Sequence, residues 1–363
     1  MSDLFSPIHI GDLELPNRIV IPPMDQYSAE DGFPGNWHRM HYGHLAVSGT
    51  GLLIIEATAV ESKGRISNAD LGIWNESLQD SHKEFVSFIR SFSQTPIAVQ
   101  LGHSGRKGST LPPFEGNGPL EVSCGGWAVC APSAEKYNPV SPKPEAMTLD
   151  DIHNCTELFA QAAKRSVAAG YDAIEIHAAH GYLLHQFLSP LANTRTDAYG
   201  GSLENRMRFP LEVFAAIRSA VPGKFPVGIR ISGSDFTPGG WDAASSVVFA
   251  KELEKAGCAF IHVSGGGLTP DQKIQLAPGY QVALSAEVKK NVSIPVIAVG
   301  LITQVELAAA IIETGQADMV AIGRGMLYNP RWPWHAAAKL GKTIHAPKQY
   351  LRCEPRNAKG LFI

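Results

Sequence analysis

The sequence predicts a (β/α)8 TIM barrel, from eight short apolar runs and the helix-like segments that alternate with them. Most of these runs are rich in Ile, Val and Leu on both alternating faces, which is typical of parallel strands buried on both sides. Eight repeats of strand followed by helix favour a closed barrel. The predicted strands cover residues 18–22, 51–57, 96–101, 172–177, 225–231, 259–264, 294–299 and 318–323.

The intervening segments have the periodicity and the end signals of helices. Amphipathic stretches cover residues 150–169, 203–220, 243–256 and 304–314. Thr148-Leu-Asp-Asp151 has the form of a capping box, in which two side chains satisfy the first backbone N–H groups. Gly170, Gly257 and Gly315 stand where helices are expected to stop. A doubly wound open sheet is the alternative, but no Gly-x-Gly-x-x-Gly follows the first predicted strand.

One segment interrupts the alternation, residues 104–145, which are dense in Pro, Gly and Ser. We expect a long loop after the third strand, with Phe114 and Trp127 as its anchors. Loops of this length often serve as lids or subunit contacts, although a structural excursion without a role in the chemistry is equally compatible. We therefore expect one domain over residues 1–363, with this excursion and a C-terminal tail at 345–363.

Bulk composition excludes several classes of protein. The chain has 363 residues, of which 44% are hydrophobic and 18% charged, and a formal net charge of −3. This balance gives no electrostatic reason to bind nucleic acid or an anionic membrane. The N-terminal residues lack the pattern of a signal peptide, and no apolar run approaches a membrane span, so we expect a cytoplasmic protein. Five widely spaced cysteines without a Cys-x-x-Cys pair argue against a disulfide framework or a metal cluster.

The most informative stretch for function is Ile174-Glu-Ile-His-Ala-Ala-His-Gly-Tyr182. His177, His180 and Tyr182 cluster where the fourth predicted strand passes into a loop. Two imidazoles can donate hydrogen bonds to one carbonyl oxygen, and a phenol can protonate the neighbouring carbon. The alternative is that one histidine is a satisfied core residue and the other a loop residue. No third ligand accompanies them, so we do not expect a metal site.

Other strand ends suggest a phosphate site and a site for a flat heterocycle. The sixth, seventh and eighth strands end in Ser264-Gly-Gly-Gly267, Gly300 and Gly323-Arg324. Glycines allow backbone N–H groups to approach an anion, and barrels usually bind phosphate after the seventh and eighth strands. Gln100 and Arg230 offer an amide and a permanent cation to a ring with donor and acceptor edges. The structural alternatives are a salt bridge at the barrel rim for Arg324 and a buried ion pair for Arg230.

With these residues in view, almost the whole chain resembles the Old Yellow Enzyme family of FMN-dependent ene-reductases. The most specific match is Asn193-Thr-Arg-Thr-Asp-Ala-Tyr-Gly-Gly-Ser-Leu-Glu-Asn-Arg206, and Gln100-Leu-Gly-His-Ser-Gly-Arg106 also matches. The short length and Tyr27 suggest the thermophilic-like subgroup. The resemblance implies an oxidoreductase that uses noncovalent FMN and NADPH or NADH to reduce α,β-unsaturated carbonyl or nitro compounds in a ping-pong cycle.

The resemblance also implies a role for each candidate residue. Tyr182 would donate the proton, while His177, His180 and Tyr27 would bind the substrate. The residues implied to bind FMN are Pro22, Pro23, Met24, Asp25, Ala57, Gln100, Arg230, Gly300, Gly323 and Arg324. Pro347-Lys-Gln-Tyr-Leu-Arg352 resembles a tail whose arginine enters the partner subunit's substrate pocket, which implies a homodimer or homotetramer. The alternative for Arg352 is a solvated arginine of the tail.

The chain departs from the subgroup at one position, since Asp25 stands where the subgroup usually has cysteine. This substitution affects the expected flavin potential and substrate preference but not the fold. Two alternative functions remain at this point. A flavin-free barrel lyase or isomerase of a phosphorylated substrate would explain the glycines and Arg324 but not the family signature. A flavin-binding protein without catalysis would not explain the set His177, His180 and Tyr182.

Overall fold

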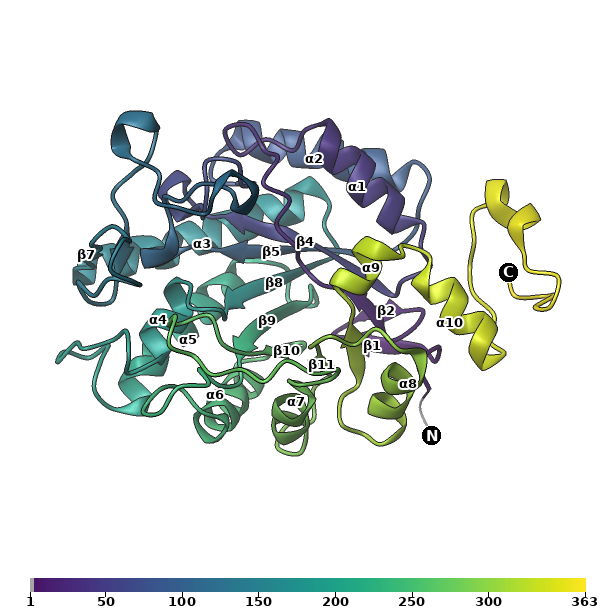
Figure 1. Cartoon of the computed structure of the whole chain (residues 1–363). Helices are drawn as coiled ribbons and strands as arrows, with labels where there is room; N and C mark the ends of the chain where they lie inside the picture. Colours follow the sequence, from purple (N-terminus) through teal and green to yellow (C-terminus); the bar gives the residue numbers. More distant parts are fainter. Residues whose placement is uncertain (1–2) are drawn as a thin grey trace.

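The protein forms a closed barrel of eight parallel strands, as the sequence predicts (Figure 1). The computed structural model describes residues 3–363. Around the barrel the strands follow the chain order, and the barrel closes where β12 pairs with β3, with Val320 opposite Ile19. The strands are β3 (Ile19–Ile21), β4 (Leu52–Ala59), β5 (Ile97–Gly102), β8 (Ala173–Ala178), β9 (Val227–Ser232), β10 (Ile261–Ser264), β11 (Val296–Ala298) and β12 (Met319–Ala321).

Helices surround the barrel and begin and end close to the predicted signals. Thr148 and Asp151 form the expected capping box at the start of α3, and Gly170 ends that helix with a left-handed φ of 91°. Gly257 and Gly315 follow the caps of α6 and α8. The helices are α1 (Asn36–Ala46), α2 (Glu76–Arg90), α3 (Leu149–Ala169), α4 (Leu183–Leu188), α5 (Leu203–Ala220), α6 (Ala243–Lys255), α7 (Val282–Lys289), α8 (Val305–Glu313), α9 (Arg324–Tyr328) and α10 (Trp332–Leu340).

A short hairpin that the sequence did not predict closes the N-terminal end of the barrel. Strands β1 (Ile8–Ile10) and β2 (Leu13–Leu15) pair in antiparallel fashion. Ile10 and Leu15 are fully buried, in one apolar cluster with Val20, Leu52 and Phe260 from the barrel strands and their flanks. Figure 1 shows the hairpin at the right-hand end of the barrel, away from the loops that follow the strands. Apolar side chains therefore seal this end.

The excursion after β5 is an irregular segment with three 3₁₀ turns and one strand, β6 (Cys130–Ala131), which pairs with β7 (Glu145–Ala146). Trp127 anchors it as expected, since its indole N–H donates to the Lys63 carbonyl oxygen at 2.9 Å and its ring faces the Arg65 guanidinium. The prediction that Phe114 is an anchor is wrong, because its side chain is 70% exposed. Its ring instead lies edge-on to Tyr27, with 6.3 Å between the centroids.

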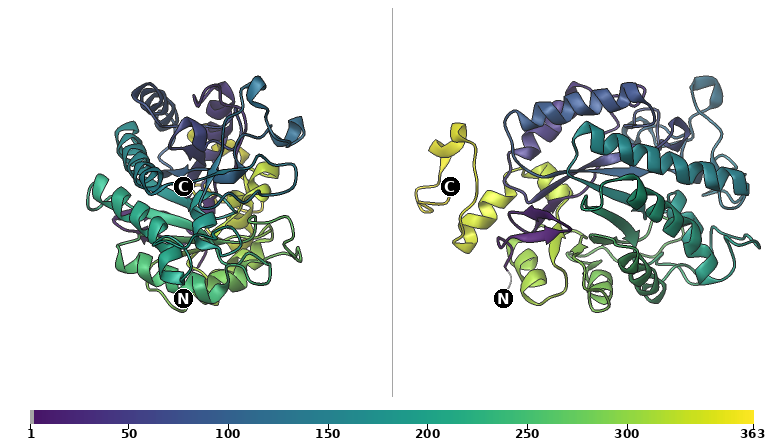
Figure 2. Two further views of the ribbon diagram at one scale, coloured as in Figure 1. Left: turned by 90° about the vertical axis from the view of Figure 1, so that its left-hand side faces the viewer. Right: turned by 180° about the vertical axis from the view of Figure 1, so that it is seen from behind.

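The C-terminal tail and the excursion lie at opposite ends of the molecule, as the side views in Figure 1 and on the right of Figure 2 show. Ile344 and Leu361 pack with Trp334 of α10. Arg331 links α10 to the tail, because its guanidinium lies 4.8 Å from the centre of the Trp334 ring and 5.3 Å from that of Tyr350. Within residues 3–363, no helix has both the length and the apolar character needed to span a membrane.

Candidate active site

A cavity of about 260 Å³ opens at the C-terminal ends of β3, β9, β11 and β12. In a parallel barrel these ends meet on one face, so residues distant in sequence are brought together. Seven of the candidate residues line the cavity, namely Pro22, Pro23, Met24, Arg230, Gly300, Gly323 and Arg324. Ser264, at the end of the sixth predicted strand, lines it too, as do Tyr280 and Gln281, for which no role was predicted.

Main-chain atoms line the part of this cavity that follows β11 and β12. Gly300 has a φ of 131°, which a residue with a side chain rarely adopts. A Cβ atom at Gly323 would lie 3.3 Å from the Met24 sulfur and 3.5 Å from Pro22 Cγ. The exposed Arg324 follows directly and lines the same cavity. The two glycines keep the wall thin where a guanidinium is available, which suits a bound phosphate.

Arg230 is a buried cation in the cavity wall with a free hydrogen-bond donor. It lies on β9 and is 8% exposed. Burial lowers the pKa of the guanidinium, while the charges of Glu175 and Asp25 raise it. Among residues 3–363, its Nε has no hydrogen-bond partner. Because a buried donor is costly to leave unpaired, this atom indicates a ligand that supplies an acceptor or negative charge there.

Gln100 belongs to a buried polar network that the sequence analysis missed. Its amide nitrogen donates to a Glu175 carboxylate oxygen at 2.8 Å, and the other oxygen lies 2.8 Å from His262 Nδ1. All three side chains are buried, and together with Arg230 they lie on the adjacent strands β5, β8, β9 and β10. The network could have been predicted from the polar residues inside two apolar runs, Ile174-Glu-Ile176 and Ile261-His-Val263. The network fixes the orientation of the Gln100 amide.

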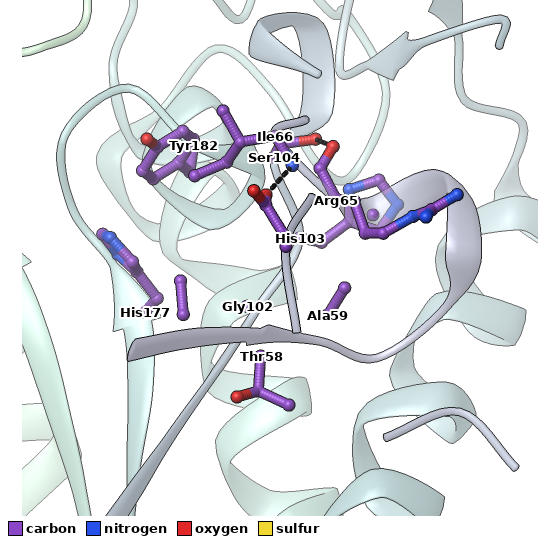
Figure 3. A pocket seen from close by; sticks show the side chains of 12 residues that line it. Thr58, Ala59, Arg65, Ile66, Gly102, His103, Ser104, His177 and Tyr182 are labelled. Carbon is purple, nitrogen blue, oxygen red and sulfur yellow. Dashed lines mark hydrogen bonds between the residues drawn. The ribbon is translucent and has the colours of Figure 1, made fainter. Parts of the chain in front are cut away.

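His177, His180 and Tyr182 come together where β8 ends. His177 is the last but one residue of the strand, and His180 has a φ of 58° in the following turn. His177 Nε2 lies 3.4 Å from His180 Nδ1, and the His177 and Tyr182 ring centres are 4.8 Å apart. His177 and Tyr182 also line a second, small cleft with Ala57 from β4, and both lie on the same side of it (Figure 3).

The environment keeps all three groups uncharged. Burial lowers the pKa of both histidines well below its ordinary value, and the charge of Arg230 adds to this effect. Burial and the charge of Asp25 raise the pKa of Tyr182. Neutral imidazoles are donors on one nitrogen, and a phenol with a raised pKa keeps its proton until an acceptor forms beside it.

Lys107 connects this cluster to the excursion and to β10. Its ammonium donates to the carbonyl oxygens of His180 and Gly267, each at 2.8 Å. The same nitrogen lies 4.9 Å from the ring centres of Tyr182 and Tyr137. Burial lowers the pKa of Lys107 to about 8, and Arg106 contributes. Lys107 therefore holds the loop that carries His180 and Tyr182.

Asp25 lies after β3, where its carboxylate accepts a hydrogen bond from the Ala57 N–H at 3.1 Å. Burial raises its pKa well above the ordinary value, and the neighbouring Asp70 and Glu56 raise it further. Its neighbour Tyr27 is half-buried and has a φ of 48°. Asp25 and Tyr27 are near enough to Tyr182 for their charges to raise its pKa.

Arg352 is the one candidate that the fold does not bring to this site. It lies in a 3₁₀ turn, Lys348–Cys353, in which no residue is buried. This turn belongs to the tail, at the opposite end of the molecule from the excursion (Figure 2). Arg352 therefore has no access to the cavity of its own chain.

Comparison with known proteins identifies the family. The model of the NADH:flavin oxidoreductase / NADH oxidase family matches residues 3–343. The chain belongs to this family. It is 43% identical to an NADPH dehydrogenase of Geobacillus sp. (strain WCH70) over 351 residues, which cover 96% of this chain and 98% of the relative. It is 40% identical to the NADH:flavin oxidoreductase FG08077 of Gibberella zeae over 364 residues, which cover 95% of this chain and 88% of the relative.

Solved structures agree with this assignment. Morphinone reductase in complex with tetrahydroNAD superposes with a TM-score of 0.78 at 29% identity, covering all of this chain and 98% of that one. A 2-naphthoyl-CoA reductase has a TM-score of 0.84 at 24% identity, covering 94% of this chain and 52% of its own, and supports the fold alone. The protein is thus an oxidoreductase of the Old Yellow Enzyme type that uses FMN and a nicotinamide reductant.

The cavity fits the FMN of this family. Its glycine-lined end next to Arg324 suits a phosphate, and the Arg230 Nε, which has no partner within residues 3–363, suits an electron-rich ring edge. The flavin-free lyase that the sequence left open is therefore excluded by the family to which the chain belongs.

Proposed function

We propose that this flavin oxidoreductase reduces the C=C bond of α,β-unsaturated carbonyl or nitro compounds with electrons from NADPH or NADH. The observation that carries the proposal is the set of two neutral histidines and a neutral tyrosine at the end of β8, beside a cavity with a buried cation. Donors for an oxygen and a proton source for a carbon are the groups that this reaction needs from the protein.

The residues that would hold FMN are those of the large cavity and its neighbours. Gly300, Gly323 and Arg324 would bind the phosphate, and Arg230 and Gln100 would contact the ring, with Pro22 to Asp25 and Ala57 around it. Bound FMN supplies hydride transfer, which couples nicotinamide oxidation to alkene reduction in a ping-pong cycle.

The protein's own part in the reaction is to bind, polarise and protonate. His177 and His180 donate hydrogen bonds to the substrate oxygen, which makes the β-carbon more electrophilic and stabilises the negative charge that develops on oxygen. Tyr27 helps to bind the substrate. Tyr182 then gives its phenolic proton to the α-carbon, and the nearby Lys107 ammonium stabilises the phenolate.

Turnover of a small enone and a nitroalkene with each nicotinamide tests the proposal. Purified enzyme should carry bound FMN, oxidise NADPH or NADH, and convert the enone to the saturated ketone. If bound FMN is reduced by nicotinamide but reoxidised only by oxygen, and never by the panel, the proposal is wrong.

Asp25 should add a pH-dependent contribution of its own to the flavin midpoint potential. Its raised pKa means that the carboxyl is neutral at low pH and becomes negative as the pH rises through that pKa. Negative charge near a cofactor that gains negative charge on reduction opposes reduction. We expect the parent and the isosteric Asp25→Asn variant to have similar midpoint potentials at acidic pH. At higher pH the parent should lie lower by about 30 mV or more, which for two electrons corresponds to about 1.4 kcal/mol.

A spectroelectrochemical titration of both proteins across pH measures this difference. The asparagine side chain retains an oxygen that can accept the Ala57 N–H, so the comparison isolates the charge. An Asp25→Cys variant provides the residue usual in the subgroup and should resemble the Asp25→Asn variant. Potentials of the parent and of Asp25→Asn that coincide at every pH would leave Asp25 a role in pocket shape alone.

From the tail we predict an oligomer in which Arg352 of one chain enters the substrate pocket of a neighbouring chain. Arg352 is exposed, and the tail that carries it lies at the opposite end of the molecule from the excursion (Figure 1). Exposed apolar side chains, Trp37 and Met40 of α1 and Leu327 and Tyr328 of α9, add a surface that a second copy can cover. We expect a dimer or tetramer by light scattering at micromolar concentration, and an Arg352→Ala enzyme with a higher KM for substrate. A monomer with full activity contradicts this proposal.

A further inference from the structure

A chain of hydrogen bonds leads from His177 through His180 to Ser264 and Gln281, between the substrate cluster and the FMN cavity. His177 Nε2 lies 3.4 Å from His180 Nδ1, and His180 Nε2 lies 2.7 Å from Ser264 Oγ. Ser264 Oγ in turn donates to Gln281 Oε1 at 3.5 Å. The Gln281 amide nitrogen donates to the Gly265 carbonyl oxygen, which turns its Oε1 toward Ser264.

The donors determine where the protons lie in this chain. The Ala179 N–H donates to His177 Nδ1 at 3.2 Å, so the neutral His177 carries its proton on Nε2. That proton is directed to His180 Nδ1, which therefore accepts, and the proton of His180 lies on Nε2. His180 Nε2–H then donates to Ser264, whose hydroxyl donates to Gln281. Every bond in the chain therefore runs in the same direction.

This arrangement is incompatible with two histidines that both donate to one substrate oxygen. His177 can donate from Nε2 as it stands, but His180 must carry its proton on Nδ1, the atom that faces His177. Its Nε2 must then accept a hydrogen bond. A serine hydroxyl can both donate and accept, and Ser264 Oγ is already within 2.7 Å of that nitrogen.

We propose that Ser264 is a positioning residue that selects the donor tautomer of His180 when a substrate oxygen binds, by turning its hydroxyl from Gln281 to His180 Nε2. The inference rests on the proposed binding of that oxygen by His177 and His180. The proton count is unchanged, because neutral His180 releases the Nε2 proton to water and takes one proton from water on Nδ1. The backbone of His180 stays fixed, since its N–H donates to Ser232 Oγ and its carbonyl accepts from Lys107.

Nitrogen-15 NMR of histidine-labelled, FMN-loaded enzyme tests the tautomer directly. We expect His180 to be protonated on Nε2 in the free enzyme and on Nδ1 with 4-chlorophenol bound, whose oxygen accepts from both rings. In Ser264→Ala no hydroxyl can donate to the bare Nε2 of the bound tautomer, so the affinity for the phenol should fall about 3- to 10-fold, the range of one hydrogen bond. Ser264→Thr, which keeps a hydroxyl, should behave like the parent.

A second substitution separates this role from a general structural effect. An asparagine at position 180 presents N–H donors whatever Ser264 does. Adding Ser264→Ala to His180→Asn should therefore change the affinity by less than about twofold. FMN content, measured by absorbance, shows whether each variant retains the cofactor. If Ser264→Ala loses FMN, the comparison of free and bound parent enzyme decides alone.

The outcomes distinguish the two proposals. If phenol affinity is unaffected by removing the His180 side chain in His180→Ala, the proposed binding of the oxygen fails. If the phenol depends on His180 but the proton stays on Nε2 in the bound parent, the role of Ser264 is overturned while the proposed function stands. Equal losses from Ser264→Ala in the parent and His180→Asn backgrounds overturn it too.

Discussion

The Tyr182→Phe enzyme should reduce an enone about 100- to 10,000-fold more slowly than the parent, while its oxidation of nicotinamide stays nearly unchanged. Only the second half-reaction places a proton on carbon, and the phenol is the donor proposed for it. The raised pKa of Tyr182 keeps this proton in place, and Phe retains the ring that packs against His177. Stopped-flow measurement of the two half-reactions tests the prediction.

The neighbouring tyrosine provides a matched control. The Tyr137 ring lies at the same distance of 4.9 Å from the Lys107 nitrogen as the Tyr182 ring does. A Tyr137→Phe enzyme loses one phenol beside that ammonium but not the proposed donor, so its enone reduction should be slowed far less. Equal slowing of both half-reactions in Tyr182→Phe would assign Tyr182 a role in positioning rather than in proton donation.

The His180→Ala enzyme should lose about 2 to 4 kcal/mol of stabilisation for the substrate oxygen, the range for one donor to a developing oxyanion. The loss should appear as weaker phenol binding and slower reoxidation of reduced FMN by an enone. His180→Asn, which restores an N–H donor, should recover much of it. Equilibrium titration and single-turnover kinetics measure the two effects, and an Ala variant that matches the parent in both would refute the assignment.

The sequence predicted the parts of the site that depend on strand ends. Gly300, Gly323 and Pro22 come from three separate strands, yet parallel strands in a barrel must end on one face, so their meeting could be predicted. The same reasoning gave the cluster at His177. The regular alternation of apolar runs with capped helical segments was sufficient to predict the barrel.

Other features could not be predicted because they depend on tertiary contacts. The exposure of Phe114 depends on how an irregular loop lies against Tyr27. The three-residue strands of the N-terminal hairpin are too short to show a period. The directions of the bonds at Ser264 depend on backbone N–H groups and distances, and the position of Arg352 depends on the fold of the tail.

The hairpin of β1 and β2 determines how molecules reach the reaction centre. Because Ile10 and Leu15 close one end of the barrel, the approach along its axis that residues 3–363 leave open is from the loop face. Reductant and oxidant must therefore use the same entrance in turn and cannot be bound face to face from opposite sides. In the proposed reaction, an abundant alkene that occupies the oxidised enzyme would obstruct the nicotinamide, so we expect the best substrates to inhibit in excess. We then expect competition for this entrance, as well as chemistry, to limit the rate in a mixture of substrates.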